Sequence, residues 1–205
     1  MSEELDENGN KVIFLGESFV GKTNLIKISL GKKFDPQSLS TWATSSSPRE
    51  FVYNKQKYIF NLWDTIGQEK YRALTKIFFN HAIIVILVYD ITQRNTFTEL
   101  DYWLEQVRNE LSNDYILAIV ANKSDLYSEE EVSENEGKEY AKNNGAKFKL
   151  TSAKENPLSF VQFLEELFIE YLQKKNQNIQ NRPRGISLAK NEQQNNIENE
   201  NKKCC

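Results

Sequence analysis

Short apolar runs alternate with amphipathic stretches from Lys11 onward, and this alternation is the main structural signal in the chain. Residues 82–90 and 115–123 are almost continuously apolar, which is typical of strands buried on both faces of a sheet. A polar stretch around Asn54–Gln56 predicts a tight turn between two shorter runs. In all, the shorter runs predict further strands at residues 11–16, 49–54, 57–64 and 146–152.

Several segments between these runs carry apolar residues at helical spacing. We expect helices at residues 22–30 and 96–111, and a strongly amphipathic last helix at residues 158–172. Strands that alternate with helices favour a largely parallel sheet with helices on both faces. The pattern therefore predicts an α/β fold.

The two ends of the chain differ in composition from its body. Residues 1–10 are predicted to be a disordered leader, and residues 11–175 to form the folded domain. Residues 176–205 contain 12 Asn and Gln residues and no aromatic residue, so they bury too little apolar surface to offset the entropy of ordering. We expect a flexible tail with a root-mean-square reach of roughly 30 Å.

The overall composition excludes several classes of protein. The chain has 205 residues, a net charge of −3 and only two cysteines, Cys204 and Cys205 at its end. This charge balance argues against a protein that binds nucleic acid without sequence specificity. A disulfide framework is excluded and a reducing compartment is favoured. The longest apolar run is too short to cross a bilayer.

Residues 16–23, GESFVGKT, match the pattern GxxxxGK[ST] between a predicted strand and a predicted helix. Phosphate oxygens need several donors at close range, and the backbone amides of such a loop and of the helix N-terminus supply them. We expect Lys22 to reach the β- and γ-phosphates and the Thr23 hydroxyl to coordinate Mg²⁺. The motif predicts a phosphate-binding loop, but by itself it names neither the base nor the reaction.

A second motif, ANKSD at residues 121–125, follows a predicted buried strand. The carboxylate of Asp125 can accept hydrogen bonds from the ring NH and the exocyclic amino group of guanine, a donor pair that adenine lacks. Asn122 is expected to brace the loop, and the Lys123 stem to cover the base. In TSAK, residues 151–154, a backbone amide can reach the guanine carbonyl. Together with the phosphate loop, these motifs predict guanine recognition.

A third motif, LWDTIGQE at residues 62–69, ends another predicted strand. Asp64 lies where a carboxylate would hold Mg²⁺ through water, the Gly67 amide can reach a γ-phosphate, and Gln68 can orient an attacking water. Thr41 lies in a linker long enough to fold over the nucleotide, where it could be a second Mg²⁺ ligand. Taken alone, Thr41 is only one of several hydroxyl residues in that linker.

Together these stretches resemble a small GTPase of the Ras superfamily over about Lys11 to Tyr171. Details typical of the Rab branch are the tryptophan of WDT, the stretches EKYRALT and LVYDIT, Trp103 and the double-cysteine end. The resemblance implies a six-stranded, mostly parallel sheet with one antiparallel edge strand. It also implies that Phe34 flanks the guanine ring.

The resemblance assigns roles to residues of all the motifs. Lys22, Gly67 and Gln68 would be catalytic, and Thr23, Thr41 and Asp64 would hold Mg²⁺. The nucleotide would be bound by Glu17, Ser18, Phe19, Val20, Gly21, Lys22, Thr23, Asn24, Phe34, Thr41, Asp64, Gly67, Asn122, Lys123, Asp125, Ser152, Ala153 and Lys154.

The implied function is that of a GTP/GDP switch that hydrolyses GTP slowly and regulates vesicle-mediated transport. Its partners would be an exchange factor, a GTPase-activating protein, escort and GDP-dissociation-inhibitor proteins, and effectors, with no nucleic acid. Geranylgeranyl groups on Cys204 and Cys205 would anchor a monomer to the cytoplasmic face of an endomembrane or vesicle, in exchange with the cytosol.

The sequence departs from the family pattern at three places. Ile66 replaces the usual alanine of DTxGQ, and its bulk could keep Gly67 from closing on the γ-phosphate, which would impair hydrolysis. Phe19 stands where the loop usually has a small residue, so its side chain must point out of the phosphate cradle. Ala43 and Ser46 replace a glycine and an aromatic residue after Thr41, which predicts unusual effector recognition.

Two other functions remain open from the sequence. Ile66 and Phe19 are compatible with a GTP/GDP-binding interaction protein that has negligible hydrolysis. A phosphotransferase acting on a nucleotide would need arginines to clamp a second phosphate-bearing substrate, and the chain shows no such cluster. A preference for guanine over adenine nucleotides distinguishes the GTP-binding functions from the phosphotransferase.

Overall fold

The computed structural model describes residues 9–38, 41, 43–66, 79–112 and 114–180. Its described strands form one six-stranded sheet in the order β2-β3-β1-β4-β5-β6. They are β1 (Lys11–Leu15), β2 (Ser45–Tyr53), β3 (Gln56–Asp64), β4 (Ala82–Asp90), β5 (Ile116–Asn122) and β6 (Lys147–Leu150). Neighbouring strands run parallel except for β2 and β3, which are antiparallel. The predicted α/β fold, including its antiparallel edge strand, is confirmed.

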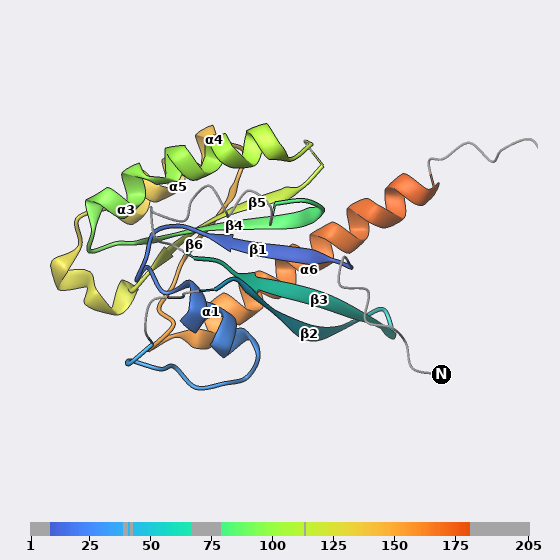
Figure 1. The fold of residues 1–205 in the computed structure, drawn as a ribbon, viewed down its shortest axis with the longest axis horizontal. Coiled ribbons are helices and arrows are strands. Elements are labelled where there is room, and N and C mark those ends of the chain that lie inside the picture. Colours follow the sequence, from blue (N-terminus) through green and yellow to red (C-terminus); the bar gives the residue numbers. More distant parts are fainter. Residues whose placement is uncertain (1–8, 39–40, 42, 67–78, 113, 181–205) are drawn as a thin grey trace, which may run out of the picture.

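Helices cover both faces of this sheet (Figure 1). On one face lie α3 (Arg94–Thr98), α4 (Leu100–Glu110) and α5 (Glu134–Asn143), and on the other lie α1 (Lys22–Ser29) and α6 (Pro157–Gln180). The predicted helix at 96–111 is thus observed as two short helices that meet at Glu99.

The sheet separates two hydrophobic cores. Successive side chains of a strand point to opposite faces, so Ile13 packs in the core under α3, α4 and α5. Its neighbour Phe14 packs in the core under α1 and α6, where its ring meets that of Phe160 edge to face. All of β1, β4 and β5 is buried except Ile83, as expected for strands covered on both faces.

The edge strand β2 begins at Ser45, four residues before the predicted start. The first half of β2 is polar, so the hydrophobic pattern does not predict a strand there. The whole of β2 nevertheless pairs with β3 in continuous register, from Ser45 opposite Asp64 to Tyr53 opposite Gln56. Asn54 and Lys55 both have positive φ, at 50° and 65°, as a two-residue type I′ hairpin turn requires. The predicted tight turn is confirmed.

The helix α5 was not predicted, because it carries few apolar residues. Its signal lies at its start, where the Ser133 hydroxyl accepts a hydrogen bond from the amide of Glu136, as in a capping box. A Cβ atom at Gly137 would lie 2.3 Å from the Tyr89 hydroxyl and 2.6 Å from the Phe148 ring. Glycine therefore allows the helix to lie close against the sheet.

The folded part extends slightly beyond the expected domain limits. The last helix continues to Gln180, five residues past the expected end of the domain, through a stretch without Gly or Pro. At the other end, the Asn10 side chain donates to the carbonyl of Ile59 at 2.9 Å, and Asn61 donates to the carbonyl of Gly9 at 3.2 Å. Residues 1–8 and 181–205, including Cys204 and Cys205, lie outside the described residues.

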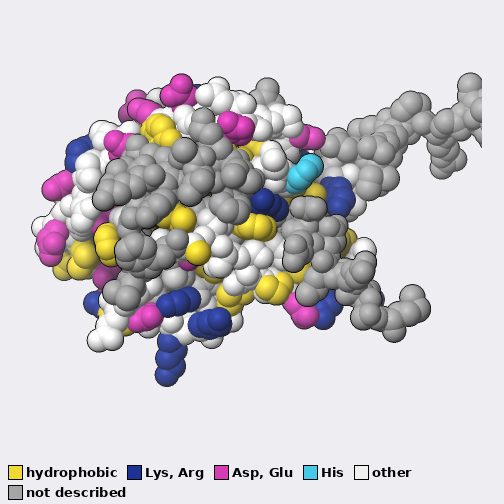
Figure 2. Space-filling view, viewed as in Figure 1, with side chains coloured by type: hydrophobic (Ala, Val, Ile, Leu, Met, Phe, Trp, Pro, Cys, Tyr) yellow, Lys and Arg dark blue, Asp and Glu magenta, His cyan; other side chains and the backbone are white. Residues whose placement is uncertain are grey.

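The described surface carries charges of both signs (Figure 2). Acidic side chains gather along the left and upper edges of this view, and basic side chains project from its lower edge. No helix among the described residues combines the length and apolar character needed to cross a membrane.

The contact between the hairpin and α6 depends on stacked aromatic rings. The rings of Phe60 and Phe168 stack in parallel at 3.8 Å, and Phe60 is fully buried. Replacing Phe60 with alanine leaves a cavity, and we expect Phe60→Ala to lower the free energy of unfolding by about 3–5 kcal/mol. Urea unfolding measures this loss. Val52→Ala on the same hairpin is the control, because Val52 is 66% exposed and should change stability by less than about 0.5 kcal/mol. Equal losses for the two variants would contradict this account of the packing.

Candidate functional site

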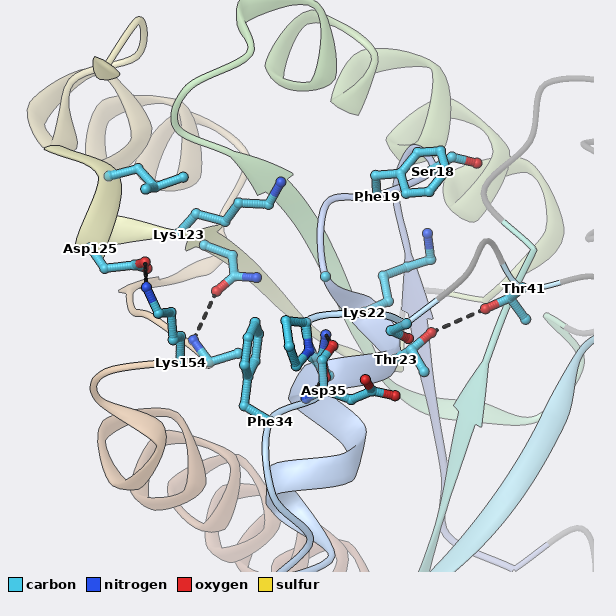
Figure 3. Close-up of a pocket in the computed structure, with 17 residues that line it drawn as sticks. Ser18, Phe19, Lys22, Thr23, Phe34, Asp35, Thr41, Lys123, Asp125 and Lys154 are labelled. Carbon is cyan, nitrogen blue, oxygen red and sulfur yellow. Dashed lines mark hydrogen bonds and ion pairs between the residues drawn. The ribbon is translucent and has the colours of Figure 1, made fainter. Parts of the chain in front are cut away.

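A cavity of about 420 Å³ lies where the loops that follow β1, β5 and β6 meet. Ligands bind in α/β sheets at this carboxyl end of the parallel strands. In the view of Figure 3, Asp125, Lys123 and Lys154 lie on one side and Thr23 and Thr41 on the other, with Phe34 between them. Residues of the phosphate loop and of the ANKSD and TSAK stretches thus line a single cavity, although these stretches are far apart in the chain.

Most of the predicted site residues line this cavity. They are Ser18, Phe19, Gly21, Lys22, Thr23, Asn24, Phe34, Thr41, Asn122, Lys123, Asp125, Ala153 and Lys154. Four others are adjacent: Val20 is buried in the core, Glu17 accepts from the Trp103 indole at 3.2 Å, and Asp64 and Ser152 bond to lining residues. Gly67 and Gln68 lie outside the described residues.

The loop between β1 and α1 presents backbone amides to the cavity. Gly21 precedes α1 with φ at 102° and has no side chain to cap the helix, so the first-turn amides are left for a ligand. A Cβ atom at Gly21 would lie 2.3 Å from Nδ2 of Asn122, so only glycine fits here. Phe19 lies at the rim of the cavity and is 68% exposed, as expected for a side chain that turns out of the cradle.

The ammonium of Lys22 lies folded over the same loop. Its Nζ donates to the carbonyl oxygens of Gly16 and Glu17, each at 2.8 Å. Burial lowers the pKa of Lys22 to about 8, although the charges of Asp64 and Glu17 act to raise it. An anion bound in the loop would favour the charged form of this side chain.

Three side chains bring oxygen atoms together beside Lys22. The Thr23 hydroxyl donates to Oδ2 of Asp64 at 2.7 Å and lies 3.0 Å from the Thr41 hydroxyl, which is itself 3.5 Å from the same Asp64 oxygen. Burial raises the pKa of Asp64, partly offset by the Thr23 hydrogen bond and the Lys22 charge. Oδ1 of Asp64 is buried without a hydrogen-bond partner. Mg²⁺ prefers oxygen ligands. These three oxygen-bearing side chains, with one carboxylate oxygen that has no hydrogen-bond partner, therefore fit this ion.

Asn122 joins the loops around the cavity. Its Nδ2 donates to the carbonyl of Val20 at 2.8 Å, and its Oδ1 accepts from the amide of Ala153 at 3.2 Å. The side chain is nearly fully buried, so the loops after β1, β5 and β6 share one hydrogen-bonding centre. The predicted bracing role of Asn122 therefore has a defined geometry.

Asp125 is held at the far end of the cavity. Its Oδ1 accepts from the Ser152 hydroxyl at 2.6 Å, and its Oδ2 lies 3.9 Å from Nζ of Lys154. The carboxylate is only 7% exposed. It is thus oriented to accept hydrogen bonds from a ligand that enters the cavity.

Sequence reasoning missed several residues of the site. Asp90 forms a 2.5 Å ion pair with Nζ of Lys123 and so fixes the direction of that side chain. Asp35, Pro36 and Ser38 line the cavity beside Phe34. None of these stands in a motif with a predicted role, and the LVYDIT stretch that contains Asp90 was recognised only as a family feature.

Ile66 lies two residues after Asp64, which is the last residue of β3. The hydroxyl of Thr65 donates to the carbonyl of Phe14 at 2.5 Å, which ties this end of β3 to β1. Ile66 is buried, with 8% of its surface exposed. Its side chain therefore lies packed in the protein immediately before Gly67.

Comparison with known proteins agrees with this geometry. Residues 11–177 match the model of the Ras family. The chain is 39% identical over 144 residues to "Ras-related protein Rab-2B" of Dictyostelium discoideum, covering 70% of this chain and 71% of that protein. It is 38% identical over 160 residues to human "Ras-related protein Rab-21", covering 78% and 69%. It is 34% identical over 182 residues to rabbit "Ras-related protein Rab-25", covering 87% and 84%. The chain therefore belongs to the Ras family and is a Rab-like small GTPase.

Proposed function

We propose that the cavity holds GTP or GDP, with the phosphates on the loop at residues 16–23 and the guanine between residues 122–125 and 152–154. The observation that carries this proposal is the continuity of the cavity, which runs from Lys22 and Thr23 to Asp125. A guanine nucleotide has anionic phosphates at one end and a base that donates hydrogen bonds at the other. The phosphates would meet the charge of Lys22, and the base would meet the carboxylate of Asp125.

At the phosphate end, the amides of the loop and of the first turn of α1 bind the β- and γ-phosphate oxygens. Lys22 moves its Nζ from the carbonyls of Gly16 and Glu17 to the phosphates, where its positive charge is matched. The side chains of Thr23, Thr41 and Asp64 are the proposed Mg²⁺ site, supported by their convergence and by the unpaired Asp64 oxygen. The ion neutralises charge on the phosphates when it is bound.

At the base end, Asp125 accepts from the ring NH and the exocyclic amino group of guanine. The Ser152 hydroxyl holds this carboxylate in place. The loop of Ala153 and Lys154, which lines this end of the cavity, brings a backbone amide within reach of the guanine carbonyl. The Lys123 stem, directed by Asp90, covers one face of the base, and Phe34 flanks it. Adenine lacks this donor pair, so the buried Asp125 carboxylate would gain no hydrogen bond from the base, and the site selects guanine.

As a Rab-like GTPase, the protein hydrolyses GTP to GDP and phosphate and serves vesicle-mediated transport. We assign Gln68 to orienting the attacking water and the Gly67 amide to the γ-phosphate. Binding of GTP orders the segments around Thr41 and Gly67 into an effector surface, and hydrolysis releases them. An exchange factor and an activating protein set the rates of these two steps, and the activator adds roughly 10³–10⁵-fold.

The tail completes this proposal. Geranylgeranyl groups on Cys204 and Cys205, added through an escort protein, anchor the monomer to the cytoplasmic face of an endomembrane or vesicle. Two lipid chains give stable anchoring where one gives only marginal binding. A GDP-dissociation inhibitor that covers these lipids would return the GDP-bound protein to the cytosol.

The role of Asp125 predicts a change of base specificity. Asp125→Asn presents one donor and one acceptor in place of two acceptors, so it suits the ring NH and C2 carbonyl of xanthine. We expect the affinity for GDP to fall roughly 100-fold and the affinity for xanthosine diphosphate to rise. Calorimetric titration with both nucleotides measures this. Asp101→Asn, remote from the cavity, is the control, and an unchanged GDP affinity in Asp125→Asn would refute the assignment.

The position of Ile66 predicts slow hydrolysis. Replacing it with alanine frees space beside Gly67, so we expect Ile66→Ala to hydrolyse preloaded GTP several-fold faster than the natural chain in a single turnover with Mg²⁺. Gln68→Leu, which cannot orient water, should abolish turnover. A natural chain as fast as Ile66→Ala would show that Ile66 does not limit the reaction, and turnover that survives in Gln68→Leu would remove Gln68 from its role.

A further inference from the structure

The segment that carries Phe34 forms one wall of the cavity. Phe34, Asp35, Pro36 and Ser38 line it opposite the loops of the base end. In Figure 3, Phe34 extends between Lys154 and Asp35. The segment follows the C-terminal end of α1 without regular secondary structure of its own, so other contacts must fix its position.

The side-chain amide of Asn24 supplies two of those contacts. Its Nδ2 donates to the backbone carbonyl of Asp35 at 3.0 Å, and its Oδ1 accepts from the backbone amide of Asp35 at 2.9 Å. Asn24 lies in the first turn of α1 and is only 8% exposed. The pair of bonds uses both polar groups of the Asn24 side chain and both backbone groups of the residue that follows Phe34.

A third contact reaches the same residue from the next turn of α1. Nζ of Lys27 forms a 2.9 Å ion pair with Oδ2 of Asp35. Both side chains are about one third or more exposed, at 32% and 42%, and exposed ion pairs of this kind contribute little. The buried amide of Asn24 is therefore the contact that matters for the position of the segment.

We propose that Asn24 is a positioning residue that latches Phe34 against the guanine ring and so sets the rate at which nucleotide leaves. The inference rests on the proposed function, since it takes the base to lie beside Phe34. If the segment swings out to release the base, both bonds to Asp35 break. The amide of Asn24 is then left in a largely buried position without these partners, a costly arrangement. This cost raises the barrier to release.

Release of GDP carrying an N-methylanthraniloyl fluorophore, chased with excess unlabelled GDP in Mg²⁺, tests the latch in the full chain. We expect Asn24→Ala to release this nucleotide roughly tenfold faster than the natural chain, from the loss of two buried hydrogen bonds. Lys27→Ala, which removes only the exposed ion pair to the same residue, is the matched control and should stay within about twofold. The serine hydroxyl of Asn24→Ser is too short to reach Asp35, so this variant should release the nucleotide as fast as Asn24→Ala. It replaces Asn24→Ala in the test if the alanine variant fails to fold.

A double-mutant cycle separates a latch from a general loosening of α1. If Asn24 acts through Phe34, then in a Phe34→Leu background the added change Asn24→Ala should accelerate release by less than about twofold. A full tenfold effect in that background would overturn the proposed route. Release from Asn24→Ala at the natural rate would overturn the latch itself while leaving guanine nucleotide binding intact. Failure of the natural chain to retain the labelled GDP at all would instead overturn the proposed function.

Discussion

The buried amide of Asn122 is the constraint on which the site depends. It ties the carbonyl of Val20 to the amide of Ala153, so the phosphate loop and the loop after β6 meet at the end of β5. The same nitrogen lies so near Gly21 that no side chain fits there. Because neither loop has regular structure of its own, a partner fixed at the end of a fully buried strand defines where both lie.

The sheet makes this arrangement possible by bringing strand ends together. Its central strands β1, β4 and β5 are covered on both faces by separate cores, so their carboxyl ends are fixed relative to one another. Burial of the polar groups placed there carries a cost that contacts within the protein relieve only in part. The lowered pKa of Lys22 and the raised pKa of Asp64 both express burial of a charge, and a phosphate and a cation would reverse them. Both shifts support the proposal that an anion and a cation bind side by side in this site.

Much of this could be predicted from the sequence, and the exceptions share one cause. Asn122, Lys22 and Asp125 stand in local motifs whose strand and helix context is visible in the chain. Other contacts join separate segments of the chain, and no local sequence pattern predicts them. Examples are the hydrogen bonds between Asn24 and Asp35 and the ion pair between Asp90 and Lys123. The helix α5 escaped prediction because its packing depends on Gly137 lying against Tyr89 rather than on an apolar stripe.

Hydrogen exchange of the GDP-bound protein tests the central role of Asn122 most directly. In Asn122→Ala, the account predicts that amide exchange accelerates together in residues 16–23 and 151–154, including the amide of Ala153 that donates to Asn122. These two segments are far apart in the chain, and they share the lost side chain as a partner. Faster exchange confined to residues 121–125, with natural protection kept in the other two segments, would contradict the account.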